Sequence, residues 1–155
     1  MSTPASDARR QYFAYGANII AAEMARRCPA AREIGTVVLP GWRFVVGERG
    51  YGTLVPDPAA RVVGVLWSLT PACERTLDEF EEIDGGLFRR ESIVIAGEPT
   101  LVYLAADAAP GSVRAGYLEP VIAAAEARGF PADYVEVLRG WLSRASAPPP
   151  SSRAP

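Results

Sequence analysis

The sequence predicts an α+β fold in which short strands form a curved or barrel-like sheet and helices pack beside it. Segments of strand character and of helical character are interleaved along the chain instead of forming two separate halves. The apolar residues within Arg61–Leu69 are nearly continuous, which indicates a strand buried on both faces, in a barrel or beneath helices. About six short strands are expected in total.

The length and composition favour a single domain. With 155 residues and a hydrophobic fraction of 49%, the chain is long enough to bury one core and short for two. Residues 1–10 show no hydrophobic periodicity, and residues 147–155 are rich in proline. We therefore expect one domain over residues 11–143, with flexible tails at 1–10 and 147–155.

The first element to justify is the junction within Gln11–Ile20. Its first half is aromatic and typical of a buried strand, and Gly16 then breaks the run. Asn18 stands where it could cap a helix over Ile19–Arg27. The first N–H groups of such a helix lack internal partners and favour an anion or a polarised carbonyl. The alternative is that Gly16 supplies only a tight turn and Asn18 only a cap.

The next segments predict consecutive strands of a sheet. The strand-like ranges are Glu33–Leu39, Trp42–Gly47, Thr53–Val55 and Arg61–Leu69. Pro40–Gly41 is expected to form a turn, and Pro56–Pro58 is expected to stop the brief third strand.

A helix is expected over Pro71–Glu82, because Thr70 can act as its N-cap and proline suits the first helical position. Leu77 precedes Phe80 by three residues and Glu81 by four, so the three side chains project from one face. We expect that face to point inward, which would place the Glu81 carboxylate near the buried side. The acidic neighbours are expected to stay in water: Asp78, Glu79 and Glu82.

The remaining chain predicts two more strands and two helices. Alternation over Leu87–Ala96 favours a strand, and a hairpin turn at Gly97–Pro99 leads to a last strand over Thr100–Ala105. Helical segments follow at Val113–Arg128 and Asp133–Leu142, separated by a glycine and a proline.

The charge and residue content exclude several classes of function. The net charge is −2 and the 16 basic residues are dispersed, so no nucleic-acid partner is expected. No apolar run reaches the roughly 18 residues of a membrane span, and the N-terminus lacks the apolar core of a signal peptide, so we expect a cytoplasmic protein. The chain has no histidine, which excludes histidine-dependent triads and zinc sites. Cys28 and Cys73 are expected to be free thiols.

Four segments of the chain together resemble the γ-glutamylcyclotransferase family. Tyr12–Asn18 is similar to the Tyr-Phe-Ala-Tyr-Gly-Ser-Asn signature that opens that family. Leu77–Glu81 resembles its second block, and Phe88-x-Arg90-x-x-Ile93-x-Ile95 follows its Tyr-x-Arg-x-x-Val-x-Val pattern. The segment from Tyr117 to Tyr134 is similar in spacing to the C-terminal helical region of the family. The resemblance covers most of residues 12–138.

The resemblance implies a small mixed β-barrel flanked by helices, with a pocket between the Tyr15 turn and the helix that carries Glu81. There, the α-amine of a γ-glutamyl group would attack its own γ-carbonyl, giving 5-oxoproline and a free amine. Glu81 would be the catalytic acid/base, and no metal or cofactor would be needed. The partner would be a small γ-glutamyl compound, and the protein a monomer or homodimer. The implied substrate-binding residues are Tyr15, Gly16, Ala17, Asn18, Phe88 and Tyr117.

Three departures from the family pattern leave the substrate open. Ala17 replaces a serine, Phe88 replaces a tyrosine, and Glu82 replaces a glycine. One alternative is therefore a binding or accessory domain without catalysis, and another is a hydrolase or isopeptide-cleaving enzyme of the same fold. Glu81 itself could instead belong to a solvated acidic face. The leaving amine is expected to contact the loops Glu48–Gly52 and Asp84–Leu87.

Overall fold

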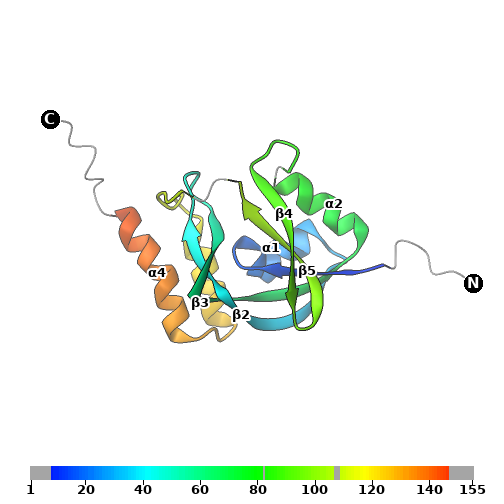
Figure 1. The fold of residues 1–155 in the computed structure, drawn as a ribbon, viewed down its shortest axis with the longest axis horizontal. Coiled ribbons are helices and arrows are strands. Elements are labelled where there is room, and N and C mark those ends of the chain that lie inside the picture. The colour runs from blue at the N-terminus through cyan, green and yellow to red at the C-terminus, as the bar shows by residue number, and fades with distance from the viewer. Residues whose placement is uncertain (1–7, 82, 107–108, 147–155) are drawn as a thin grey trace, which may run out of the picture.

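The computed structural model describes residues 8–81, 83–106 and 109–146, and it confirms the α+β class (Figure 1). The strands are interleaved with helices as predicted. In chain order the elements are β1 (Arg10–Ala14), the 3-10 helix η2 (Ala17–Ile19), α1 (Ala21–Arg27), β2 (Arg32–Val46), β3 (Gly52–Leu69), α2 (Pro71–Phe80), β4 (Phe88–Ile95), β5 (Glu98–Ala105), α3 (Leu118–Ala127) and α4 (Ala132–Ser146).

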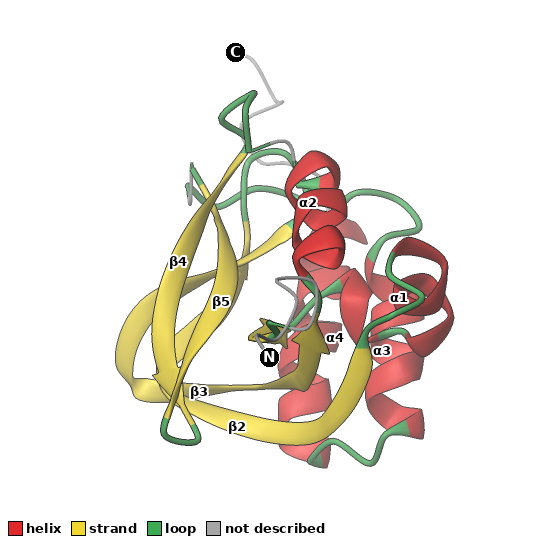
Figure 2. Ribbon diagram, turned by 90° about the vertical axis from the view of Figure 1, so that its right-hand side faces the viewer, coloured by secondary structure: helices red, strands yellow, loops and turns green. Residues whose placement is uncertain are grey.

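The strands form one mixed sheet in the order β2-β3-β1-β5-β4. The central strand β1 runs antiparallel to β3 and parallel to β5, while β2 and β4 lie at the two edges. The sheet is strongly curved, and the helices gather on one side of it (Figure 2). Within the described residues the two edge strands do not pair with each other, so the sheet is a barrel only in a loose sense.

The two longest strands replace what the sequence predicted as separate short ones. The expected turn at Pro40–Gly41 and the expected stop at Pro56–Pro58 are both wrong, because β2 and β3 continue through them. Pro40 lies opposite Arg61 and Trp42 lies opposite Pro56, with a register shift between them. Residues 57–60 of β3 have no partner in the register, and Pro40 and Pro56 flank this irregularity. The strand pair therefore bends where it was expected to end.

Some predicted helix boundaries also shift. The first α-helix begins at Ala21 after a 3-10 turn, so the expected start at Ile19 and the capping role of Asn18 are wrong. The second begins at Pro71 with Thr70 as its N-cap, as predicted, but ends at Phe80. The third begins at Leu118 instead of Val113. Arg10 belongs to β1 instead of a tail, and the other expected tail residues 1–7 and 147–155, like Glu82, lie outside the described residues.

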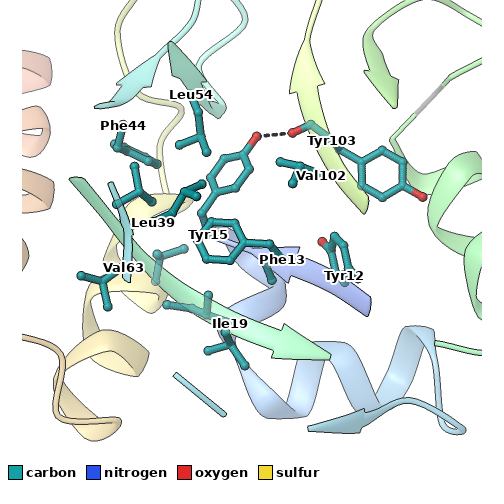
Figure 3. Packing of buried hydrophobic residues seen from close by; sticks show 14 of the residues in the cluster. Tyr12, Phe13, Tyr15, Ile19, Leu39, Phe44, Leu54, Val63, Val102 and Tyr103 are labelled. Atoms are coloured by element: carbon teal, nitrogen blue, oxygen red, sulfur yellow. Dashed lines mark hydrogen bonds between the residues drawn. The ribbon is translucent and has the colours of Figure 1, made fainter. Parts of the chain in front are cut away.

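The core lies where β1 and the C-terminal half of β3 meet the helices. The predicted two-sided burial of Arg61–Leu69 is confirmed, since Val62, Val63 and Val65 are almost completely buried. Phe13 of β1 packs in the same cluster, together with Ile19 and Tyr15 from the segment that follows it (Figure 3).

β1 and β3 approach each other closely at Gly64. A Cβ atom at this position would lie 2.3 Å from the carbonyl oxygen of Ala14 and 2.6 Å from the ring of Phe13. Ala14 directly precedes the turn at Tyr15 and Gly16, so this contact fixes the position of that turn relative to β3.

We expect Gly64→Ala to lower the free energy of unfolding by about 1–3 kcal/mol, because the new methyl group must displace backbone or a buried ring. Gly140→Ala is the matched control. Gly140 lies inside α4 with nothing within 4 Å of a built Cβ, so the same change there should stabilise the protein by about 0.5–1 kcal/mol. Urea denaturation measures both, and equal effects of the two substitutions would contradict the close contact.

Candidate functional site

A cavity of about 280 Å³ opens between the end of β1, the end of α2 and the start of β4. It receives residues from distant parts of the chain, and every residue that the sequence analysis proposed for the site borders it. These residues are Tyr15, Gly16, Ala17, Asn18, Glu81, Phe88 and Tyr117. The other described residues that line it are Tyr12, Arg27, Tyr51, Gly52, Phe80, Leu87 and Tyr103.

Glu81 directly follows α2, and its backbone N–H donates to the carbonyl of Leu77 at 2.8 Å, which holds it on the last turn. Its carboxyl group borders the cavity and makes no side-chain hydrogen bond or ion pair with any described residue. Burial raises the pKa of Glu81 to about 7, and the positive charge of Arg27 opposes that shift. Glu81 is thus a carboxyl group that can both give and take a proton near neutral pH.

The neighbours of Glu81 on α2 only partly match the prediction. Leu77 is fully buried, as expected, but Phe80 is 52% exposed. Asp78 stays partly in contact with water, with 30% of its side chain exposed, but it also accepts hydrogen bonds from Arg90 Nη1 and from the Tyr103 hydroxyl, the latter at 2.6 Å. Asp78 therefore joins α2 to β4 and β5, which holds the end of the helix in place.

The turn after β1 presents backbone to the cavity. The phenol of Tyr15 donates to the carbonyl oxygen of Tyr103 at 2.5 Å and so joins the turn to β5 (Figure 3). Gly16 and Ala17 start η2, and the first N–H groups of a helix have no partner within it. The turn can therefore offer backbone donors, while the Tyr15 hydroxyl is already engaged.

Tyr117 places its hydroxyl group between two glycines. The oxygen accepts a hydrogen bond from the Gly52 N–H at 3.2 Å. A Cβ atom on Gly16 would lie 2.6 Å from the same oxygen, so only glycine fits there. Burial raises the pKa of Tyr117 to about 12, despite the hydrogen bond from Gly52, so the phenol keeps its proton. That proton is available to a ligand in the cavity.

Asn18 joins two other residues of the cavity and does not cap α1. Its Oδ1 accepts a hydrogen bond from Arg27 Nη1 at 2.5 Å, and its Nδ2 donates to the Tyr12 hydroxyl at 3.0 Å. Its carbonyl oxygen accepts from Trp67 Nε1 at 3.0 Å. Asn18 is only 5% exposed, so it acts as a buried support for Arg27 and Tyr12.

Arg27 was not proposed for the site by the sequence analysis, although its position left a signal. Arg27 lies three residues after the fully buried Met24, so a charged side chain stands on the inward face of α1. Tyr51 belongs to the loop Glu48–Gly52 that was expected to contact the leaving amine, and it borders the cavity because this loop folds back toward Tyr117. Their rings lie 5.5 Å apart in an edge-to-face arrangement.

A second cavity, of about 140 Å³, adjoins the first, and Tyr51, Leu87 and Phe88 border both. The loops that were expected to contact a leaving amine, Glu48–Gly52 and Asp84–Leu87, both contribute to its wall. The two cavities therefore form neighbouring compartments separated by aromatic and aliphatic side chains.

The described residues offer little to a metal ion. They contain no group of three or more cysteine, aspartate or glutamate side chains placed to hold one. Cys28 and Cys73 are free and buried, as expected. No helix in the described ranges is both long and apolar enough to span a bilayer.

The contact between Gly16 and Tyr117 gives a test by double substitution. Gly16→Ala should cost about 1–3 kcal/mol of stability, because its methyl group meets the phenol oxygen. In a Tyr117→Phe background the nearest remaining atom, Cζ, would lie 3.8 Å away, so Gly16→Ala should cost less there. Thermal unfolding of the four proteins measures the coupling. Strictly additive effects would show that the two residues do not meet.

Comparison with known proteins identifies the family. The family model described as gamma-glutamyl cyclotransferase, AIG2-like, matches residues 12–119, well over half of the chain. No curated protein matches.

Several solved structures share the fold. The uncharacterized protein loc79017 from Homo sapiens has a TM-score of 0.75 at 23% identity, over 84% of this chain and 86% of that one. A structure named gamma-glutamyl cyclotransferase has a TM-score of 0.74 at 20% identity, over 96% and 93% of the two chains. YkqA from Bacillus subtilis has a TM-score of 0.71 at 20% identity, over 92% of this chain and 56% of that one. The motifs, the fold and the matched family model agree, and the chain belongs to the AIG2-like gamma-glutamyl cyclotransferase family.

Proposed function

We propose that this protein is a γ-glutamyl cyclotransferase, which converts a γ-glutamyl amide into 5-oxoproline and a free amine or amino acid. The observation that carries the proposal is Glu81, a half-buried residue that borders the same cavity as the turn at Gly16 and whose carboxyl group has no partner among the described residues. Membership of the AIG2-like family supports the reaction class.

The reaction needs one group that moves protons. The α-ammonium of the substrate gives a proton to the Glu81 carboxylate, and the resulting amine attacks the γ-carbonyl carbon. The C–N bond to the leaving group then breaks, and Glu81 returns the proton to the departing nitrogen. The attacking nitrogen loses a second proton as the lactam forms, and the released amine takes up that proton to leave as an ammonium ion. A single carboxyl group with a pKa of about 7 suits both steps, because its two forms are similarly populated near neutral pH.

Negative charge develops on the γ-carbonyl oxygen during the attack. The N–H groups of Gly16 and Ala17 and the hydroxyl proton of Tyr117 are the donors available to that oxygen. Fixed donors of this kind stabilise an oxyanion without reorganising. Because the contact uses the backbone, an alanine at position 17 leaves it intact.

The cavity walls hold the substrate in a reactive shape. The nucleophile and the carbonyl belong to one molecule, so positioning can supply about 7–11 kcal/mol of the barrier reduction. Phe88 and Leu87 contribute an apolar wall in place of the phenol that the family pattern would have at position 88. The leaving group would extend past this wall into the adjoining cavity, which is bordered by residues of the loops Glu48–Gly52 and Asp84–Leu87.

The class of reaction can be tested directly. We expect incubation with a panel of γ-glutamyl amines and γ-glutamyl amino acids to release 5-oxoproline, detected by chromatography. Release of free glutamate would favour the hydrolase alternative. Binding of these compounds without any turnover would favour the alternative of a non-catalytic domain.

Glu81→Gln should lower kcat by about 10² to 10⁴, the usual contribution of a general acid/base. Glu79→Gln is the matched control, because Glu79 lies on the same helix but is exposed and outside the cavity. Steady-state kinetics with the best substrate of the panel measures both. Unchanged turnover in Glu81→Gln would remove this residue from the mechanism.

The pH dependence should follow the raised pKa of Glu81. The carboxylate form must be present to accept a proton, so kcat/KM should rise with pH and level off above about pH 7. A rise of kcat/KM with its midpoint at about pH 4–5, the ordinary range for the pKa of glutamate, would show that burial does not raise the pKa of Glu81.

The same pKa shift predicts a pH-dependent effect on stability. From about pH 4.5 to 7 the folded protein retains a proton that the unfolded chain releases, so stability falls as pH rises through this window. Glutamine does not titrate. Glu81→Gln should therefore be close to wild type at pH 4 and more stable by about 1–2 kcal/mol at pH 8, allowing for partial exposure. Thermal melts at both values measure this, and a pH-independent difference would contradict it.

A further inference from the structure

Arg27 is a largely buried cation that borders the same cavity as Glu81. Its side chain is 12% exposed. The guanidinium carbon lies 3.7 Å from the centre of the Phe80 ring, so the ring covers one face of the cation. Nη1 donates to Asn18 and Nη2 lies 3.3 Å from Glu23 Oε1. These contacts fix both the plane and the orientation of the group.

The charge of Arg27 is incompletely balanced within the described structure. Glu23 also pairs with Arg26, at the shorter distance of 2.6 Å, so one carboxylate serves two arginines. Asn18 is neutral. Glu81 forms no ion pair with Arg27 within 4 Å, and Nε of Arg27 is buried without a partner among the described residues. An arginine has five N–H donors, and two of them account for the hydrogen bonds described.

Arg27 and Glu81 are the two charged side chains among the described residues that line the cavity. A γ-glutamyl group carries an ammonium and a carboxylate on the same carbon atom. Side chains that recognise these two groups must therefore lie next to each other, and they must have opposite charge. The cavity offers one such pair.

We propose that Arg27 binds the α-carboxylate of the substrate while Glu81 exchanges protons with the α-amine. This inference rests on the proposed function and names the side chain that recognises the α-carboxylate of the γ-glutamyl group. The proposal also assigns different groups of the substrate to different parts of the site. The carboxylate goes to Arg27, which leaves the N–H groups at Gly16 and Ala17 for the γ-carbonyl oxygen.

The placement of Phe80 supports this assignment. Phe80 is exposed at the end of α2, yet its ring lies over the guanidinium group of Arg27. Asn18 holds the other side of the same group. A guanidinium whose plane is already fixed loses little conformational entropy when it donates two parallel hydrogen bonds to a carboxylate. A lysine ammonium does not offer this planar pair of donors, so arginine suits a carboxylate better than lysine does.

The experiment compares two lactams by isothermal titration calorimetry. 5-Oxoproline carries the α-carboxylate, and 2-pyrrolidone is the same ring without it. Wild type should bind 5-oxoproline about 10- to 100-fold more tightly than 2-pyrrolidone, which is the gain in affinity expected from a charged, hydrogen-bonded pair. Arg27→Gln should remove most of this preference, and Arg27→Lys should restore only part of it.

Arg26→Gln is the matched control, because Arg26 contacts the same glutamate but does not border the cavity. It should keep the wild-type preference for 5-oxoproline, and a thermal melt shows that each variant is folded. Equal binding of the two lactams by wild type, or a preference that survives Arg27→Gln, would overturn the assignment. The reaction itself is judged separately by formation of 5-oxoproline from the γ-glutamyl panel, so the two proposals can fail independently.

Discussion

A half-buried carboxyl group, with no described partner to neutralise it, is the constraint around which the site is arranged. Burial favours the protonated form of Glu81 and raises its pKa to about 7. Arg27, on a different helix, opposes that shift from outside ion-pair distance. The same burial keeps the phenols of Tyr12 and Tyr117 protonated, since it raises the pKa of both, and the charge of Glu81 adds to this effect.

The fold produces this arrangement by joining three distant segments at one place. β1 occupies the centre of the sheet, so the turn that follows it lies between β3 and β5. α2 follows β3 directly, and Asp78 ties it to Arg90 of β4 and Tyr103 of β5. Tyr117 enters from the segment before α3 and contacts both glycines of the opposite wall. Each wall of the cavity is therefore fixed by contacts in the sheet as well as by its own helix.

The sequence predicted those features that depend on neighbouring residues. The buried run of β3 and the start of α2 at Thr70-Pro71 follow from local pattern, and the residues proposed for the site came from motif resemblance together with helical spacing. The errors arose where a distant partner decides the outcome. Pro40 and Pro56 do not end their strands, because β2 and β3 shift register between them and pair again on both sides of the shift. Asn18 supports Arg27 instead of capping a helix, and Phe80 stacks on that arginine, since both depend on how α1 and α2 meet.

The most direct test is to titrate the Glu81 carboxyl group itself. Carbon-detected NMR of protein with labelled glutamate, assigned by the signal that Glu81→Gln removes, gives its pKa without reference to any substrate. The account predicts a value near 7. A value near 4.3, the ordinary one for a solvated glutamate, would show that the carboxyl group faces water and that the proposed proton transfer has no basis in this site.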